Sequence, residues 1–386
     1  MFITNTLYVI ILLVYDRKGN NMPKLGKKFW KKFDFTLLIT VILLNIIGII
    51  MIKSAAPDTQ HLKMQAIAFT LGIFAIVFFT FFNYETFGKL YIPIYIFSNL
   101  LLVAVLIFGF GEEQWGARSW LAIGSFTFQP SEIAKFGIII SVAKFIDKNK
   151  EQINEIGTLI KILIFAFIPV GLILMQPDYG TAFVFIFFIF IMIFTAGLDY
   201  KYVLYAAIAG IISSPALWFT LKPYQRDRIL DFFNPSRDPM GSGYQVIQSK
   251  MAIGSGKIFG RGLFHGKLTQ SKYIPQQHTD FIFAVIGEEL GFIGGLAVLL
   301  LYFIMIYRLI KIARNAKDLF GSLIVIGIAS MMIFHIFENI GMTMGLTPVT
   351  GIPLPFLSYG GTFLLANMVS IGIALSVATK KDGINF

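Results

Sequence analysis

Residues 275–284 read Pro275-Gln276-Gln277-His278-Thr279-Asp280-Phe281-Ile282-Phe283-Ala284, and here a polar loop gives way to a long apolar run. Asp280 is the only carboxylate in this stretch. A helix that starts at Asp280 would carry a stripe of small residues at helical spacing, which is typical of a packing face. The stripe consists of Ala284, Gly287, Gly291 and Gly294. Asp280 itself is interpreted either as a helix cap or as a catalytic base at a membrane surface.

The composition is that of a membrane protein. Of the 386 residues, 56% are hydrophobic and 14% are charged, whereas soluble proteins average about 25% charged residues. The net charge of +11 suits anionic lipid headgroups or an anionic substrate, and the apolar background leaves no soluble basic domain for nucleic acid. The chain has no cysteine, which excludes a thiol nucleophile and a cysteine metal site. Its four histidines show no metal-ligand spacing.

Hydropathy predicts an all-α, polytopic membrane protein with about ten transmembrane helices. Lysine and arginine clusters fall on alternate loops, which the positive-inside rule assigns to the cytoplasm. The long loop between spans seven and eight then lies outside, although it is basic, because loops of this length translocate regardless of charge. The expected spans are 35–54, 63–83, 90–110, 130–147, 160–176, 180–198, 201–220, 280–308, 319–343 and 357–379.

The chain is expected to form one transmembrane domain over residues 35–380, which includes the extracytoplasmic loop 221–279. Residues 1–34 would be an N-terminal cytoplasmic segment, and residues 381–386 a cytoplasmic tail. Met22 precedes a run of lysines, so residues 1–21 are interpreted as an extension before the natural start or as a peripheral segment. Within the long loop, Tyr244 to Ile258 is predicted to lie on the membrane as a short amphipathic helix broken by glycines.

Four polar constellations fall on the outer side of this topology. The first joins Gly116-Ala117-Arg118-Ser119-Trp120 to Gln129-Pro130-Ser131-Glu132-Ile133-Ala134-Lys135. Glu132 and Lys135 lie one helical turn apart, so that their charges are expected to pair. The constellation is either ordinary helix-start chemistry with an interfacial tryptophan or a site for an anionic headgroup.

The other three constellations have similar alternatives. Gln176-Pro177-Asp178-Tyr179-Gly180-Thr181 joins two spans, and its aspartate is either a helix cap or a polar group in an outward cavity. Pro223-Tyr224-Gln225-Arg226-Asp227-Arg228 is either a solvated charge run or part of a site. Residues 351–361 are rich in turn formers and are predicted to form a structural re-entrant turn. Residues 254–257, Gly-Ser-Gly-Lys, lack the spacing of a phosphate-binding loop.

These residue types together favour, weakly, a transfer reaction on a lipid-linked substrate. Cations clamp phosphate or pyrophosphate groups, and one carboxylate can take a proton from a hydroxyl. A transporter for an anionic solute would use similar parts, but its signature is a pair of broken helices near the membrane midplane. A structural scaffold would leave the convergence of charged motifs unexplained.

The ordered set of motifs resembles the SEDS family of shape, elongation, division and sporulation proteins. The resemblance covers the chain from about Phe33 to Lys380. Residues 351–355 and 254–256 are more similar to the RodA branch than to the FtsW branch. The motifs are Gly-Ala-Arg-Ser-Trp, Gln-Pro-Ser-Glu-x-x-Lys, Gln-Pro-Asp-x-Gly-Thr, Gly-Tyr-Gln-x-x-Gln-Ser, His-Thr-Asp-Phe-Ile-Phe-Ala, Gly-Glu-Glu-Leu-Gly and Pro-Phe-Leu-Ser-Tyr-Gly-Gly.

The resemblance implies a peptidoglycan glycosyltransferase that polymerises lipid II on the outer face of the bacterial cytoplasmic membrane, for cell elongation and shape. Its implied partners are a class B penicillin-binding transpeptidase and other membrane proteins of the elongation complex. A lipid II flippase or an anionic-solute transporter is the alternative. The resemblance implies no cofactor for certain. It leaves open whether a divalent cation (Mg²⁺ or Mn²⁺) binds the pyrophosphate, although the sequence shows no dedicated ligand set for one.

The resemblance also assigns site residues. The essential aspartate of the family corresponds to Asp280. Many members carry arginine immediately before the tryptophan, where this chain has Ser119, so the contact made by its neighbour Arg118 stays open. The implied substrate-binding residues are Arg118, Trp120, Glu132, Lys135, Asp178 and Gln225.

Overall fold

The computed structural model describes residues 29–30, 32–56, 58–111, 117–124, 126–221, 223–234, 237 and 241–380. The expectations for residues 1–21, for the choice between Met1 and Met22, and for the tail 381–386 lie outside the described residues. Ten long helices occupy the described chain at the positions of the ten predicted spans. They are α3 (Phe35–Ala55), α4 (Thr59–Phe81), α6 (Tyr91–Phe108), α8 (Pro130–Lys148), α9 (Ile156–Leu174), α10 (Tyr179–Thr195), α11 (Tyr200–Thr220), α15 (Ile282–Arg314), α16 (Leu319–Met344) and α17 (Gly361–Lys380).

Seven of these helices are long and apolar enough to cross a membrane, judged by length and composition alone. The other three, α8, α10 and α11, are shorter in their apolar part or more charged. α10 has only 17 residues, and the charged residues of α8 include the Glu132–Lys135 pair. The chain is therefore an all-α, multi-pass membrane protein, as predicted.

Short elements connect the long helices. They are α5 (Tyr84–Lys89), the 3-10 helix η1 (Lys150–Gln152), α12 (Pro223–Phe233), α13 (Ser242–Gly256) and α14 (Lys267–Gln270). An antiparallel hairpin of β1 (Leu121–Ile123) and β2 (Phe126–Phe128) pairs Leu121 with Phe128 and stands before α8.

Aspartate and asparagine side chains start five of the helices. Each accepts a hydrogen bond from a backbone N–H of the first turn, which has no partner within the helix. The capping residues are Asp34 of α3, Asp58 of α4, Asn83 of α5, Asp178 of α10 and Asp318 of α16. The local sequence therefore determines where these helices begin.

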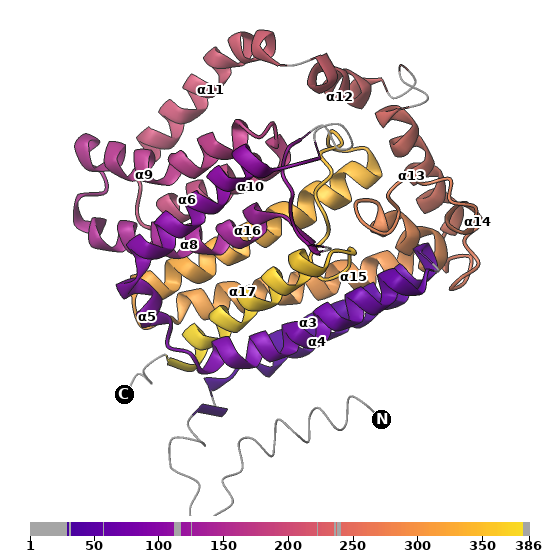
Figure 1. Ribbon diagram of the computed structural model, residues 1–386, viewed down its shortest axis with the longest axis horizontal. Coiled ribbons are helices and arrows are strands. Elements are labelled where there is room, and N and C mark those ends of the chain that lie inside the picture. The colour runs from indigo at the N-terminus through magenta and orange to yellow at the C-terminus, as the bar shows by residue number, and fades with distance from the viewer. Residues whose placement is uncertain are drawn as a thin grey trace, which may run out of the picture.

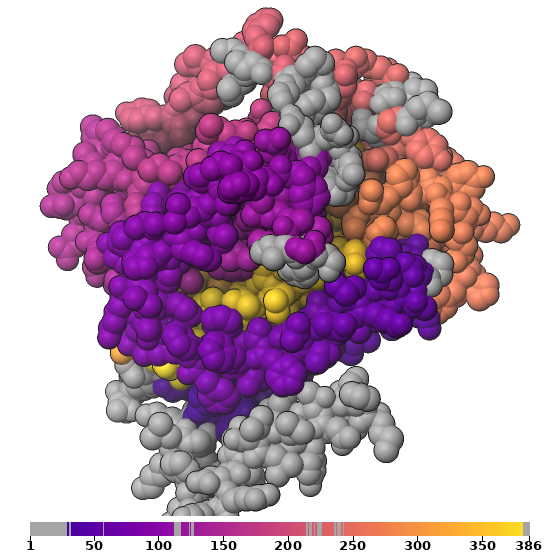
Figure 2. All heavy atoms as spheres, in the orientation of Figure 1, coloured from indigo at the N-terminus to yellow at the C-terminus, as the bar shows by residue number. Residues whose placement is uncertain are grey.

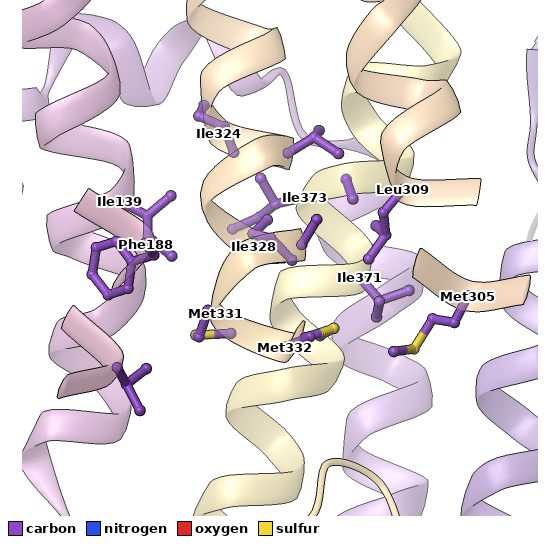
Figure 3. Packing of buried hydrophobic residues seen from close by; sticks show 14 of the residues in the cluster. Ile139, Phe188, Met305, Leu309, Ile324, Ile328, Met331, Met332, Ile371 and Ile373 are labelled. Atoms are coloured by element: carbon purple, nitrogen blue, oxygen red, sulfur yellow. The ribbon is translucent and has the colours of Figure 1, made fainter. Parts of the chain in front are cut away.

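The core lies where α8, α10, α15, α16 and α17 meet, and Figure 3 shows its interlocking isoleucines, leucines and methionines. Most of α16 and α17 is buried, whereas α11 is largely exposed and stands apart from the other helices (Figure 1). Close packing needs glycine at Gly327, because a Cβ there would meet Ile139 Cγ2 at 2.7 Å. The centre of the bundle is thus a rigid support for the loops at its ends.

The loops predicted to be cytoplasmic gather at one end of the bundle. Arg308 Nη2 lies 2.6 Å from Asp34 Oδ2, and Lys317 Nζ lies 3.3 Å from Glu85 Oε1. These contacts join residues far apart in the sequence, which agrees with the grouping expected from the positive-inside rule.

Two expectations about the region around Asp280 were wrong in detail. α15 begins at Ile282 and is broken at Gly291, whose backbone has φ 66° and ψ −163°. The small-residue stripe therefore does not form one continuous helical face, although Gly287 does pack closely against Ile253 of α13. In addition, α13 runs through Gly254 to Gly256, and its buried face packs on protein: Ser249 Oγ donates to Thr343 O at 2.7 Å.

Candidate functional site

Asp280 occupies the last turn before α15 and is held there by its backbone. Its N–H donates to Gln276 O at 3.1 Å. Asn339 Nδ2, from the buried interior of α16, donates to Asp280 O at 2.8 Å and to Ile352 O at 2.8 Å. In the described loop and helix, α15 has no side-chain cap. The interpretation of Asp280 as a helix cap is therefore wrong, and its carboxylate is left for another use.

Burial controls the ionisation of Asp280. Loss of solvation raises the pKa of its carboxyl from 3.8 to about 6, while the Thr279 hydroxyl and the positive charge of Arg228 act in the lowering direction. Gly351 lies beside the carboxylate with φ +75°, and a Cβ there would stand 3.4 Å from Asp280 Oδ2. A glycine thus leaves one side of the carboxylate uncovered.

Arg228 is the cation that the structure brings to Asp280. It belongs to α12, and its Nη1 donates to Val349 O at 3.3 Å. Together with Lys250 of α13 it lines a hollow of about 210 Å³ between α12, α13 and residues 345–349. Sequence reasoning chose Gln225 from this motif, and the side chain of that residue lies outside the described part of the structure. The three-residue spacing from Gln225 to Arg228, one helical turn, was the signal that could have found Arg228.

A second polar cluster is buried inside the bundle. Lys135 Nζ lies 2.8 Å from Glu132 Oε1, as the spacing predicted, and the two residues are 1% and 4% exposed. Lys135 Nζ also lies 3.1 Å from His335 Nε2, and its charge stands 5.5 Å from the centre of the Phe363 ring. The ammonium is therefore fully engaged by protein groups.

His335 was not selected from the sequence. Its hydrogen bonds define which of its ring nitrogens carries the proton. Its Nδ1 lies 3.2 Å from Pro353 O. A carbonyl oxygen can only accept, so Nδ1 carries the proton and Nε2 accepts from the Lys135 ammonium. A lone histidine within an apolar span, one turn before Glu338, was the only sequence signal for it.

Asp178 is a helix cap, one of the two interpretations given to it. Its Oδ1 caps α10 by accepting from Thr181 N at 3.1 Å, and its Oδ2 accepts from the Thr181 hydroxyl at 2.9 Å and from Gln129 Nε2 at 3.1 Å. Burial raises the pKa of this carboxyl, and these hydrogen bonds and the Lys135 charge counteract the shift. The cap is confirmed, and the residue also belongs electrostatically to the Lys135 cluster.

Arg118 connects the first two constellations through its backbone, and Trp120 joins the first of them to the end of α6. Arg118 N donates to Gln176 O at 3.2 Å, and Trp120 pairs with Phe110 in an antiparallel bridge. The side chain of Arg118 is exposed, whereas Ser119 is buried. Arg118 thus faces outward from the 176–178 turn.

Residues 350–353 join the two clusters. Gly351 lies beside the Asp280 carboxylate, Ile352 O accepts from Asn339, and Pro353 O accepts from His335. A Cβ on Gly180, just after Asp178, would come within 3.3 Å of Thr350 O. As predicted, this segment is a packed structural turn, and its role is to hold the surrounding polar groups in register.

The rings of His61 and Tyr359 gather around His278, two residues before Asp280 in the sequence. The His61 ring centre lies 5.0 Å from that of His278 and 4.8 Å from that of Tyr359. Burial and the neighbouring His61 lower the pKa of His278.

A family model described as "Cell cycle protein", which covers FtsW, RodA and SpoVE, matches residues 34–383. The chain is 38% identical over 358 residues to stage V sporulation protein E of Bacillus subtilis (strain 168), covering 89% of this chain and 96% of that protein. It is 37% identical over 359 residues to peptidoglycan glycosyltransferase MrdB of Escherichia coli (strain K12), covering 92% and 96%.

Solved structures show the same fold. A chain from a structure on the coordination of polymerization and crosslinking by a peptidoglycan synthase complex is 36% identical, with a TM-score of 0.79, covering 90% of this chain and 98% of that one. The crystal structure of the rod shape determining protein RodA of Thermus thermophilus is 29% identical, with a TM-score of 0.69, covering 90% and 97%.

Proposed function

The chain belongs to the SEDS family, and from this premise we propose that it is a peptidoglycan glycosyltransferase. It polymerises lipid II into glycan strands at the outer face of the bacterial cytoplasmic membrane and serves cell elongation and shape. The family supplies the activity, since relatives carry the names peptidoglycan glycosyltransferase and rod shape determining protein. The observation that carries the proposal within this chain is Asp280, a partly buried carboxylate whose pKa of about 6 is set by burial against the opposing charge of Arg228.

In the proposed reaction, Asp280 is the general base. It accepts the proton of the 4-hydroxyl of the acceptor sugar while that oxygen forms a bond to the anomeric carbon of the donor. The bond from this carbon to the pyrophosphate oxygen breaks, and undecaprenyl pyrophosphate leaves with its electron pair. A base with a pKa near 6 is mostly ionised at neutral pH and still accepts a proton readily.

Cations stabilise the negative charge that develops on the leaving group. Arg228, whose charge acts on Asp280, lines one hollow together with Lys250, and we assign them this role. Arg118, Trp120, Glu132, Lys135, Asp178 and Gln225 stay in the proposal as substrate-binding residues. Lys135 acts from within its pair with Glu132, because its ammonium already binds Glu132 and His335.

Among the residues that the structure describes, no three His, Asp or Glu side chains are arranged to hold a metal ion. We therefore derive no step of the reaction through a cation.

The proposed partner is a class B penicillin-binding transpeptidase, within a complex of elongation proteins. It is supported by the similarity to a chain from a structure on polymerization and crosslinking by a peptidoglycan synthase complex. A transpeptidase needs fresh glycan strands next to it, which a membrane-embedded polymerase supplies.

The alternative, a lipid II flippase or an anionic-solute transporter, is less well supported. Its signature is a pair of helices broken near the midplane. The break in α15 is followed by Phe292–Arg314, a helix that rises roughly 34 Å. This is enough to cross the hydrocarbon core of about 30 Å, so the break lies at the membrane boundary.

The test uses the purified full chain in lipid nanodiscs with labelled lipid II, with and without the transpeptidase. Glycan chains of growing length are expected from the wild type and not from Asp280→Asn. Thermal unfolding of both proteins shows whether the variant is folded. Lipid II translocation in sealed vesicles without polymer under any partner condition would overturn the proposal in favour of the flippase.

A further inference from the structure

The loop that follows α13 fits into the break in α15. Phe292 N donates to Lys257 O at 2.8 Å, and Ile293 N donates to Ile258 O at 3.1 Å. These N–H groups begin the second half of α15 and have no carbonyl partner in their own helix, because Gly291 interrupts it. The backbones of Gly260 and Gly291 lie so close that neither position has room for a side chain. The loop is thus an ordered part of the bundle and not a free surface loop.

The depth of this loop in the membrane follows from the residues that it contacts. Glu289, next to the break, accepts from the hydroxyl of Ser54 in the last turn of α3 at 2.6 Å, and Lys53 Nζ lies 5.7 Å from the centre of the Phe264 ring. The loop is therefore level with the outer end of α3. The second half of α15 starts at the same level and has the length of a full membrane crossing. Residues 255–264 consequently lie at the outer membrane boundary, and Figure 2 shows this orange part of the chain on the surface beside the indigo end of α3.

The tip of the loop is apolar and exposed. Phe259 is 79% exposed and Ile258 is 58% exposed. They continue the surface of Phe292, which is 66% exposed at the start of the membrane crossing. An aromatic ring at this depth is typical of side chains that anchor a protein at the bilayer interface.

Two cations flank this tip. Lys257 and Arg261 are exposed, and Arg261 Nε donates to Ser255 Oγ at 3.0 Å, which leaves the outer edge of the guanidinium facing away from the loop. The segment 255–261 surrounds an open hollow of about 450 Å³.

The nearby carboxylates do not neutralise these cations at the surface. Glu288 and Glu289 are 0% exposed. Glu288 accepts from Leu268 N at 2.9 Å and from the Thr269 hydroxyl at 2.7 Å, and Glu289 also accepts from Phe264 N at 3.1 Å. Both are used to fix the backbone that follows the loop.

We propose that residues 255–261 form a binding site for an anionic phospholipid of the outer leaflet. Lys257 and Arg261 bind the phosphate of the headgroup, and Phe259 and Ile258 insert beside the acyl chains. Long basic side chains with apolar neighbours suit this boundary, because their stems lie in the apolar layer and their charges reach the headgroups. The site is separate from Asp280 and does not depend on the proposed reaction.

The first experiment measures lipid binding. The full chain is first placed in nanodiscs that contain phosphatidylcholine and phosphatidylglycerol and is then extracted into mild detergent. Native mass spectrometry counts the phosphatidylglycerol molecules that the protein retains while this lipid is titrated. Each cation near a membrane surface contributes about 1 kcal/mol, so Lys257→Ser with Arg261→Ser should weaken binding roughly 30-fold. The control Lys267→Ser with Lys272→Ser removes the same charge from the same long loop and should leave the affinity within about 2-fold.

Three outcomes of that titration overturn the proposal. Equal weakening in both double variants would mean that binding reflects only the general positive charge. Retention of undecaprenyl pyrophosphate in preference to phosphatidylglycerol would make this a substrate site, and retention of neither lipid would leave the surface to a protein partner.

The second experiment measures depth. Because the chain has no cysteine, Ile258→Cys gives one position for a nitroxide label. In phosphatidylglycerol nanodiscs the label should be more accessible to oxygen than to a water-soluble nickel complex, and a label at Tyr273→Cys, on the same long loop, serves as the reference. Equal nickel accessibility at both positions would contradict insertion of the tip.

Discussion

The two buried polar clusters differ in how their charges are satisfied. Glu132 and Lys135 form a closed pair 2.8 Å apart, supported by His335. The backbone of Asp280 is fixed by Asn339. Its carboxylate has only the distant charge of Arg228 acting on it, and one of its sides is left uncovered by Gly351. A paired buried charge stabilises one arrangement, whereas a poorly solvated carboxylate without a close cation keeps an elevated pKa. The Glu132–Lys135 pair is therefore suited to holding the structure in place, and Asp280 is suited to reacting.

The largest effect is expected for Asp280. Replacement by alanine removes the proposed base, and polymerisation of lipid II should fall by about 10²–10⁴-fold. The fold should persist because Asn339 binds the backbone carbonyl of residue 280, which the substitution keeps. Turnover is measured with labelled lipid II, and thermal unfolding is the control. Full polymerisation by a folded Asp280→Ala protein would remove the base from the mechanism.

The closed pair should respond through stability. Lys135→Met leaves the Glu132 carboxylate buried without its cation, which typically costs about 3–5 kcal/mol. The double variant Glu132→Gln with Lys135→Met should recover most of this loss, because no buried charge is left unpaired.

Thermal unfolding and turnover are measured together on these variants. A stable double variant with low turnover would assign the pair to substrate binding. Normal turnover in Lys135→Ala combined with lower stability would restrict the pair to a structural role.

His335 should show a smaller effect with a chemical signature. His335→Ala removes one hydrogen-bond acceptor of the Lys135 ammonium, which keeps its pair with Glu132, and the donor to Pro353 O, at a cost of about 1–3 kcal/mol. His335→Gln can still accept from Lys135 and donate to Pro353, so it should recover most of the stability and turnover. Equal losses in both variants would show that only the shape of the imidazole matters.

The smallest effect concerns the pH profile. The pKa of Asp280 is raised to about 6, so the base is ionised above that pH and the rate should fall as the pH drops through about 6. Arg228 lowers this pKa, and Arg228→Gln should move the acid limb to higher pH. Since a raised carboxyl pKa means that the folded protein holds the proton more tightly, the Asp280 contribution to stability is present below pH 3.8 and is lost as the pH rises through about 6.

The profile is recorded at lipid II concentrations well below saturation, where the rate reports the ionisation of the free protein, with Lys201→Gln as a control that removes an exposed cation far from this site. An acid limb that stays in place in Arg228→Gln would show that Arg228 does not act on the base. A limb that moves equally in both variants would point to net charge alone.

Several parts of the molecule were predictable because they depend on local sequence. The apolar runs determined the helices, since a membrane segment must satisfy its backbone hydrogen bonds within itself. The three-residue spacing of Glu132 and Lys135 determined their pairing, and Asp178 could be read as a cap. Asp280 was selected as the lone carboxylate where a polar loop meets an apolar run, and then from the family motif; its catalytic role stays a prediction.

Other features depended on contacts between distant segments. Nothing near Asp280 in the sequence indicates Asn339, Arg228 or Gly351, which approach it from three other elements. The break in α15 was missed because glycine at position 291 also fits a packing stripe. Only the insertion of residues 257–260 shows why the helix must open there.

The sequence by itself determined the membrane class, the positions of the ten long helices, the family and the choice of Asp280. These follow from hydropathy and from ordered motifs, which are local properties of the chain. The tertiary structure alone decided which charged groups from distant segments approach each other, that Asp280 caps no helix, and that its carboxyl has a pKa of about 6. Ionisation depends on desolvation and on neighbouring charges, and these are set by side chains that only folding brings together.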